Sequence, residues 1–202
     1  RLLSLDCAYE TSDPESEDDV PVQLRNNAFA SNFEWVLGMY SYPKYGTFDP
    51  TVIMSIFYFI IFGMMFADVG YGLMLVLGCF GAVHFLKPRE GMKRFLLMFG
   101  YCGISCMIMG AIFGGWFGDL PYAILQNMFG IEDAKERFSY FNGLWFNPLD
   151  DPMMFLVASL GIGAVHLLTG MAIRFWILCR EKRGGDAVCD ILFYWVMVAG
   201  LA

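Results

Sequence analysis

Three ionisable side chains lie inside long apolar stretches of the sequence, where they could take part in ion transfer. They are Asp68, His166 and Arg174. A charge in the hydrocarbon core of a membrane is costly, so such a residue usually lines an ion path or pairs with another polar group. Histidine changes its charge near neutral pH, so His166 could titrate or hydrogen-bond across helices. Asp68 could line an ion exit, and Arg174 could hold a charge on a transport path.

Each of these residues also has a structural interpretation, which we favour. Asp68 precedes a Val-Gly pair, a sequence typical of a tight turn, and its carboxylate could cap the helix that follows. Arg174 lies six residues before Arg180, so its long side chain can reach the membrane interface as an anchor. His166 is interpreted as a satisfied histidine inside a helix bundle. His84, near the end of an apolar stretch, is less informative still.

The element that must position Asp68 is the stretch 51–86, in which it is the single full charge. As one helix this stretch would be about 54 Å long, whereas the hydrocarbon core of a membrane is about 30 Å thick. We therefore expect the chain to reverse at Asp68, with one span over 51–67 and a second over 69–86. Asp49 is the expected N-cap of the first span, and Pro50 suits its first turn.

The composition excludes an ordinary soluble domain. Of the 202 residues 57% are hydrophobic and only 16% are charged, and the mean hydropathy is +0.53, which leaves too little polar cover for a water-facing surface. The net charge of −7 says little, because the acidic residues are concentrated in two polar segments. The chain begins at Arg1 and stops at Ala202 within an apolar run, so we expect it to be a piece of a longer protein.

The predicted fold class is all-α: a polytopic transmembrane helix bundle with four complete spans and part of a fifth, preceded by a polar cytoplasmic segment. Residues 1–50 are expected to be the end of a cytoplasmic N-terminal region with an aromatic lead-in at the membrane interface. The bundle is expected over 51–202. Between the third and fourth spans, an apolar piece over 120–131 is too short to cross. The expected spans cover 51–67, 69–86, 95–118, 153–179 and 187–202, the last one truncated.

Small side chains recur every fourth residue along the third expected span. A ridge of this kind lets another helix approach closely, which is how helices associate in lipid, where the hydrophobic effect between them is absent. The sequence therefore predicts a packing seam that consists of Cys102, Cys106, Gly110, Gly114 and Gly118.

The six cysteines are interpreted as small apolar helix residues rather than as a disulfide or metal site. At least four lie in apolar runs, and none forms a CxxC pair. They are Cys7, Cys79, Cys102, Cys106, Cys179 and Cys189.

Basic residues predict the orientation of the bundle. The segments 87–94 and 174–183 each hold four lysines or arginines, and four alternating spans place both on one side. Positively charged connections stay in the cytoplasm, so that side is expected to be cytoplasmic, together with the N-terminal segment.

Four stretches resemble one known family, in the same order and with similar spacing. They are VPVQLRNNAFASNFEWVLGMYSYPKYGTFDPT over 20–51, IIFGMMFADVGYG over 60–72, IFGGWFGD over 112–119 and NPLDDPMMFLVASLGIGAVHLLTGMAI over 147–173. The chain from residue 20 onward resembles the membrane half of the large stator subunit of rotary V-type ATPases, called subunit a in eukaryotes and subunit I in archaea and bacteria. The most specific elements are Asp49-Pro50 before Thr51 and the turn that contains Asp68, Gly70, Tyr71 and Gly72.

The resemblance implies a non-catalytic, multi-pass membrane subunit, in the plasma membrane if the source is prokaryotic. It implies eight membrane helices, of which this chain would hold four and part of a fifth. The family subunit faces a rotating proteolipid ring of the c or K type and contributes to the transfer of protons or sodium ions. Arginines on its last two helices keep each carboxylate of the ring ionised as it passes from one aqueous half-channel to the other. Those helices would lie beyond residue 202. Membrane lipid, a peripheral stalk and soluble ATPase subunits are the other implied partners.

Two other function classes fit the sequence less well. An independent secondary transporter would need charges at the membrane midplane and inverted repeats, which we do not find. A membrane-embedded enzyme would need clustered acid–base or metal-binding residues, and the two histidines are 82 residues apart in the sequence. No P-loop or other nucleotide motif is apparent, which agrees with a non-catalytic subunit. We expect no cofactor and no nucleic-acid partner.

Overall fold

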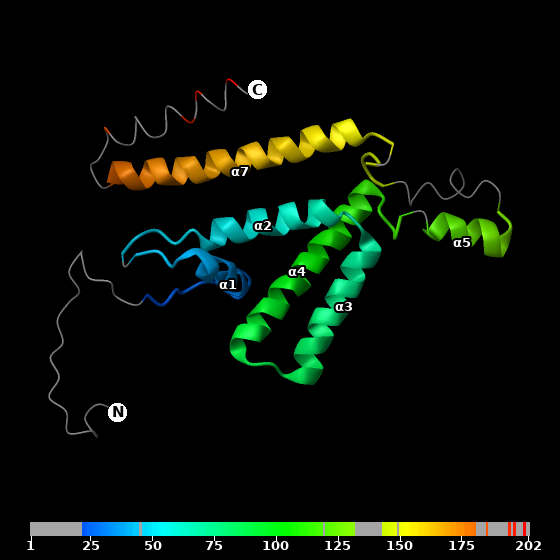
Figure 1. Ribbon diagram of the computed structural model, residues 1–202, viewed down its shortest axis with the longest axis horizontal. Helices are drawn as coiled ribbons and strands as arrows, with labels where there is room; N and C mark the ends of the chain where they lie inside the picture. The colour runs from blue at the N-terminus through cyan, green and yellow to red at the C-terminus, as the bar shows by residue number, and fades with distance from the viewer. Residues whose placement is uncertain are drawn as a thin grey trace.

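The computed structural model describes residues 22–44, 46–118, 120–131, 143–148 and 150–180, with positions 185, 194, 196 and 200. Within these residues the secondary structure is entirely helical (Figure 1). The expected N-terminal acidic segment, Cys7, Cys189 and nearly all of the expected span 187–202 lie outside the described residues. The helices are α1 (Ala30–Tyr40), α2 (Thr51–Phe66), α3 (Val69–Leu86), α4 (Glu90–Phe113), α5 (Leu120–Phe129) and α7 (Pro152–Arg180).

Three helices in the described part of the chain are long and apolar enough to cross a membrane. They are α3, α4 and α7. α2 is also apolar, but its 16 residues make it shorter than a usual span. The expected count of four complete spans is therefore not reached on helix length alone.

The reversal between α2 and α3 lies where the sequence predicts it. α2 ends at Phe66, and Ala67 adopts a left-handed conformation with φ of 40°. The Ala67 N–H donates to the carbonyl of Gly63 at 2.8 Å, which closes the last turn of α2. Asp68 is extended, and α3 begins at the next residue. Two residues therefore suffice to reverse the chain.

α4 differs from the expected span 95–118 at both ends. It begins at Glu90, so most of the basic connection is already helical, and it ends at Phe113. Gly114 takes a φ of 79°, a left-handed conformation that a glycine adopts without strain and that ends a helix. The carbonyl of Ile112 accepts hydrogen bonds from the backbone N–H groups of Leu144 and Trp145, so a distant segment covers this helix end.

The main contact in the structure joins the antiparallel helices α3 and α4 through glycines. A Cβ added to Gly72 would lie 2.7 Å from the backbone nitrogen of Met107 and 2.8 Å from the carbonyl oxygen of Gly103. A Cβ added to Gly110 would lie 2.6 Å from the carbonyl carbon of Asp68. Real side chains do not come this close to a backbone, so the two helices depend on glycine at these positions.

α1 and α7 pack against the outside of this arrangement. α1 was not expected from the sequence, and it inserts Phe33 into a buried cluster with Met98 and Cys102 of α4. α7 runs antiparallel to α2, with the rings of His166 and Phe57 separated by 4.7 Å. α2 and α7 lie beside each other and cross the α3–α4 pair at an angle (Figure 1). No residue of α7 is buried.

The glycine contact makes Gly110→Ala destabilising. The added methyl group would press on the backbone of the α2–α3 turn, which cannot move without breaking the contact, and overfilling of this kind costs about 1 to 3 kcal/mol. Thermal unfolding of the purified full-length protein should show a lower midpoint. Gly78→Ala on α3 is the matched control, because its Cβ would meet nothing within 4 Å. Equal midpoints for the two variants would contradict the contact.

Candidate functional site

Asp68 is buried at the turn, and its carboxylate caps α3. Only 7% of the residue is exposed. Its Oδ1 accepts hydrogen bonds from the backbone N–H groups of Gly70, at 2.8 Å, and Tyr71, at 3.0 Å. These N–H groups have no partner within the helix, so the carboxylate satisfies two donors that the start of α3 would otherwise leave open.

The turn that carries Asp68 is fixed to the residues that follow α4. The Val69 N–H donates to the carbonyl of Gly115 at 2.8 Å. The Phe117 ring covers Gly70 so closely that a Cβ there would overlap it, and it meets the Tyr71 ring at a centroid distance of 5.1 Å. The DVGYG stretch over 68–72 is therefore closely packed. Gly70 lies against Phe117 and Gly72 lies against α4.

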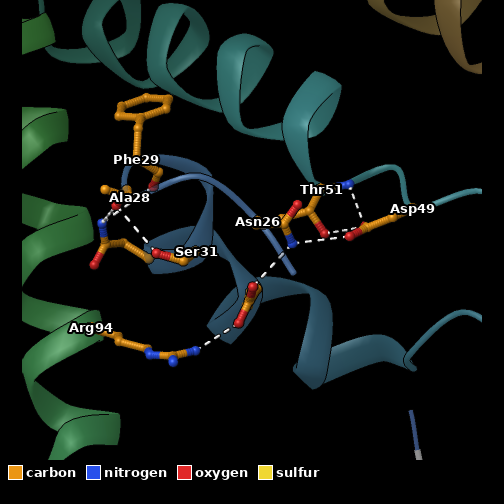
Figure 2. A network of polar contacts seen from close by, with 9 residues as sticks. Asn26, Ala28, Phe29, Ser31, Asp49, Thr51 and Arg94 are labelled. Carbon is orange, nitrogen blue, oxygen red and sulfur yellow. Dashed lines mark hydrogen bonds and ion pairs between the residues drawn. The ribbon is translucent and has the colours of Figure 1, made fainter. Parts of the chain in front are cut away.

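A polar network joins α1 to the start of α2, the end of α2 that lies away from the Asp68 turn (Figure 2). The side-chain amide of Asn26 donates to Glu34 Oε1 at 3.0 Å and to Asp49 Oδ2 at 2.9 Å. Asp49 Oδ1 accepts from the backbone N–H of Thr51 at 2.9 Å and from its hydroxyl group. The helix begins at Thr51, so Pro50 occupies the N-cap position, one residue after the expected Asp49, while the Asp49 side chain still accepts the Thr51 N–H.

An ion pair extends this network to α4. Arg94 Nη1 lies 2.6 Å from Glu34 Oε2, with 47% of the arginine side chain and 12% of the glutamate side chain exposed. The pair joins residues that are 60 positions apart and links the start of α4 to α1. Asn26, Glu34 and Arg94 are not among the site residues expected from the sequence. The one hint of an ion pair here is that Glu34 is the single carboxylate between residues 20 and 48.

The structure does not bring the three ion-path candidates together. Asp68 lies at the C-terminal end of α2, whereas His166 packs on Phe57 in the middle of that helix. Arg174 is eight residues further along α7, near Trp176, whose ring meets Phe48 before the start of α2. His166 and Arg174 are both exposed on α7. The three side chains are therefore spread along the α2–α7 pair.

The expected ridge of small residues divides into two different contacts and does not continue past α4. Cys102 and Cys106 are buried, and Cys106 Sγ lies 3.9 Å from the carbonyl oxygen of Phe62 on α2. Gly110 faces the α2–α3 turn instead. Gly114 and Gly118 lie after the end of α4 with positive φ angles, so they cannot belong to a helical ridge as expected.

Comparison with known proteins relates nearly the whole chain to one kind of membrane subunit. No family model matches the chain. It is 31% identical to the A-type ATP synthase subunit I of Thermococcus kodakarensis over 193 residues, or 93% of the chain. It is 32% identical to the subunit of the same name from Archaeoglobus fulgidus over 204 residues, or 96% of the chain. The V-type ATP synthase subunit I 1 of Treponema pallidum is 33% identical over 140 residues, or 64% of the chain.

The chain belongs to the V-type ATPase subunit I family. It spans 28% of the length of the Thermococcus relative and 29% of the Archaeoglobus relative. The three helices of spanning length in the described residues are those of a membrane protein. The resemblance recognised from the DPT and DVGYG motifs is therefore confirmed.

The cap on α3 predicts how substitutions at Asp68 behave. Asp68→Ala removes the acceptor of two N–H groups and should destabilise the full-length protein by about 0.5 to 2 kcal/mol. Asp68→Asn keeps a side-chain oxygen at the same place and should retain most of that stability. Thermal unfolding midpoints of the purified variants measure the difference. A loss as large for asparagine as for alanine would mean that the charge, and not the cap, is what matters.

The ion pair between Glu34 and Arg94 predicts a measurable coupling. Replacing each residue by Gln, singly and together, should give a coupling free energy of about 0.5 to 1 kcal/mol in unfolding experiments. The control cycle uses Glu90 and Lys93 within α4, which lie 3.5 Å apart with 80% of the glutamate and 44% of the lysine side chain exposed, and it should show almost no coupling. Equal coupling in the two cycles would remove the special role of the α1–α4 pair.

Proposed function

We propose that this chain forms part of the non-catalytic membrane stator subunit of a rotary A-type or V-type ATPase, beside a ring of proteolipids. The observation that carries the proposal is the similarity to proteins named subunit I over 93% and 96% of the chain. The complex would move protons or sodium ions, with ATP chemistry on soluble subunits and a peripheral stalk as a further partner.

Within such a subunit, the described helices suit a scaffold better than a conductor. The Asp68 carboxylate accepts the N–H groups at the start of α3, and the His166 ring packs against the Phe57 ring in a tilted arrangement. Since these two and Arg174 lie apart, they form no continuous row for ion transfer. We infer that the ion path depends on the arginine-bearing helices that the family resemblance implies, and that the helices described here hold such elements in place.

We further propose that α2 crosses the membrane although it is short. Its beginning is tied to the beginning of α4 through the chain of contacts from Asp49 to Asn26, Glu34 and Arg94. The turn at its other end contacts Gly110 and Gly115 at the end of α4. α2 therefore reaches between the same two ends as α4, a helix of spanning length.

The orientation proposed for this bundle places the starts of α2 and α4 in the cytoplasm. The basic segment 87–94 supports this orientation, because connections rich in lysine and arginine remain on the cytoplasmic side. The ion pair between Arg94 and Glu34 puts α1 at the same end of the bundle as this basic segment. The polar residues that precede α1 would then also be cytoplasmic.

Two measurements on the complete complex test the proposal. The tagged protein should co-purify with a proteolipid ring and soluble ATPase subunits, whereas an independent secondary transporter would purify without them.

Arg174→Gln should leave ATP-driven ion pumping per assembled complex close to that of the wild type, because an anchoring arginine affects insertion more than conduction. A complex that assembles and hydrolyses ATP but no longer pumps after this substitution would place Arg174 on the ion path.

A further inference from the structure

An open hollow of about 740 Å³ lies where α3, the following connection and α4 meet. Phe80 and Val83 of α3 form an apolar part of its lining. His84, Lys87 and Lys93 form a basic part. The Phe80 ring also packs on Tyr101 of α4, at a centroid distance of 6.1 Å, so this wall is held by both helices.

The basic side chains around the hollow are only partly neutralised. Glu90 also lines it, and its carboxylate lies 3.5 Å from the ammonium group of Lys93. Lys87 is exposed at the end of α3 and brings a second positive charge. The hollow therefore has two lysines and one carboxylate along its lining, a local excess of positive charge.

The first turn of α4 adds to the attraction for an anion. Its N-cap residue is Arg89, whose side chain makes no capping hydrogen bond, and Gly91 has no atom near the place of a Cβ. The N–H groups at the start of a helix attract negative charge, and phosphate groups commonly bind there. Glu90 in the same turn offsets part of this attraction, but its carboxylate lies beside Lys93, so the helix end and the two lysines together still favour an anion.

The combination of apolar and basic lining selects a lipid over a free anion. α3 and α4 are both long and apolar enough to cross a membrane, and the hollow lies at the end where they meet. A soluble phosphate would use the lysines but would gain nothing from Phe80 and Val83. Basic pockets at the ends of membrane helices are suited to anionic lipid headgroups.

We propose that this hollow binds one anionic phospholipid, with the phosphate near Lys87 and Lys93 and an acyl chain along Phe80 and Val83. The site is separate from the proposed stator role, because it contains none of Asp68, His166 and Arg174. A lipid held here would fill the space at the α3–α4 turn and join it to the surrounding membrane.

Native mass spectrometry of the purified full-length protein tests the site, with phosphatidylglycerol, phosphatidylcholine and glycerol 3-phosphate as probes. The wild type should bind one phosphatidylglycerol more tightly than phosphatidylcholine, and glycerol 3-phosphate, which has no acyl chains, should not displace it. The double substitution Lys87→Gln with Lys93→Gln should weaken phosphatidylglycerol binding by about 25-fold, roughly fivefold for each lysine. Phosphatidylcholine binding should not change.

The matched control is Arg25→Gln with Lys44→Gln, which removes two positive charges outside the hollow and should leave phosphatidylglycerol binding as in the wild type. Equal binding of the two lipids by the wild type would overturn the proposal, and this measurement needs no variant to fold. Loss of binding in the control pair as large as in the lysine pair would also overturn it. Displacement of the lipid by glycerol 3-phosphate would assign the hollow to a free phosphate ester instead.

Discussion

The close approach of α3 and α4 at Gly72, Gly103 and Gly110 is the constraint on which the other contacts depend. Between helices in lipid there is no hydrophobic driving force, so association relies on tight van der Waals packing and on interhelical hydrogen bonds. At these glycines the backbones themselves come into contact. Because Gly110 meets the backbone of Asp68 and Val69, the same approach also seats the α2–α3 turn against the end of α4. A larger side chain at this position would disturb both contacts together.

The two ends of α2 are held by different physical means. At its C-terminal end, the turn is held by backbone contacts and by the Asp68 cap, and Asp68 is buried with 7% of the residue exposed. At its start, a polar network holds it to α1 and, through Glu34, to Arg94 of α4. Part of this network is exposed to solvent. Its hydrogen bonds to charged groups are stronger than neutral ones, and Glu34 and Asn26 each bond two partners, which fixes the geometry. α2 can therefore be short and still have a defined path across the bundle.

α7 contrasts with the rest of the bundle, because none of its residues is buried although it is long and apolar. Its contacts with the other helices include aromatic pairs, such as Phe57 with His166 and Phe113 with Phe155. In lipid an apolar helix surface needs no protein cover, so this exposure is compatible with a membrane subunit. The proposed scaffold is thus a tightly packed α3–α4 pair with α2 held against it and α7 along its outer side.

The sequence by itself determined the apolar segments, the chain reversal at Asp68 and the family, because these depend on local composition and on short motifs. α3 covers the expected residues, since a turn residue before it and a basic connection after it define both of its ends. The glycines after Phe113 permit α4 to end there, and the tertiary structure decided that it does, because backbone contacts with residues 143–145 and with the α2–α3 turn hold Gly114 and Gly115 in place. It also decided that Glu34 pairs with Arg94, and that Cys106 and Gly110 face different partners. These features depend on how the helices cross, and a crossing is fixed by contacts between distant residues that no local pattern contains.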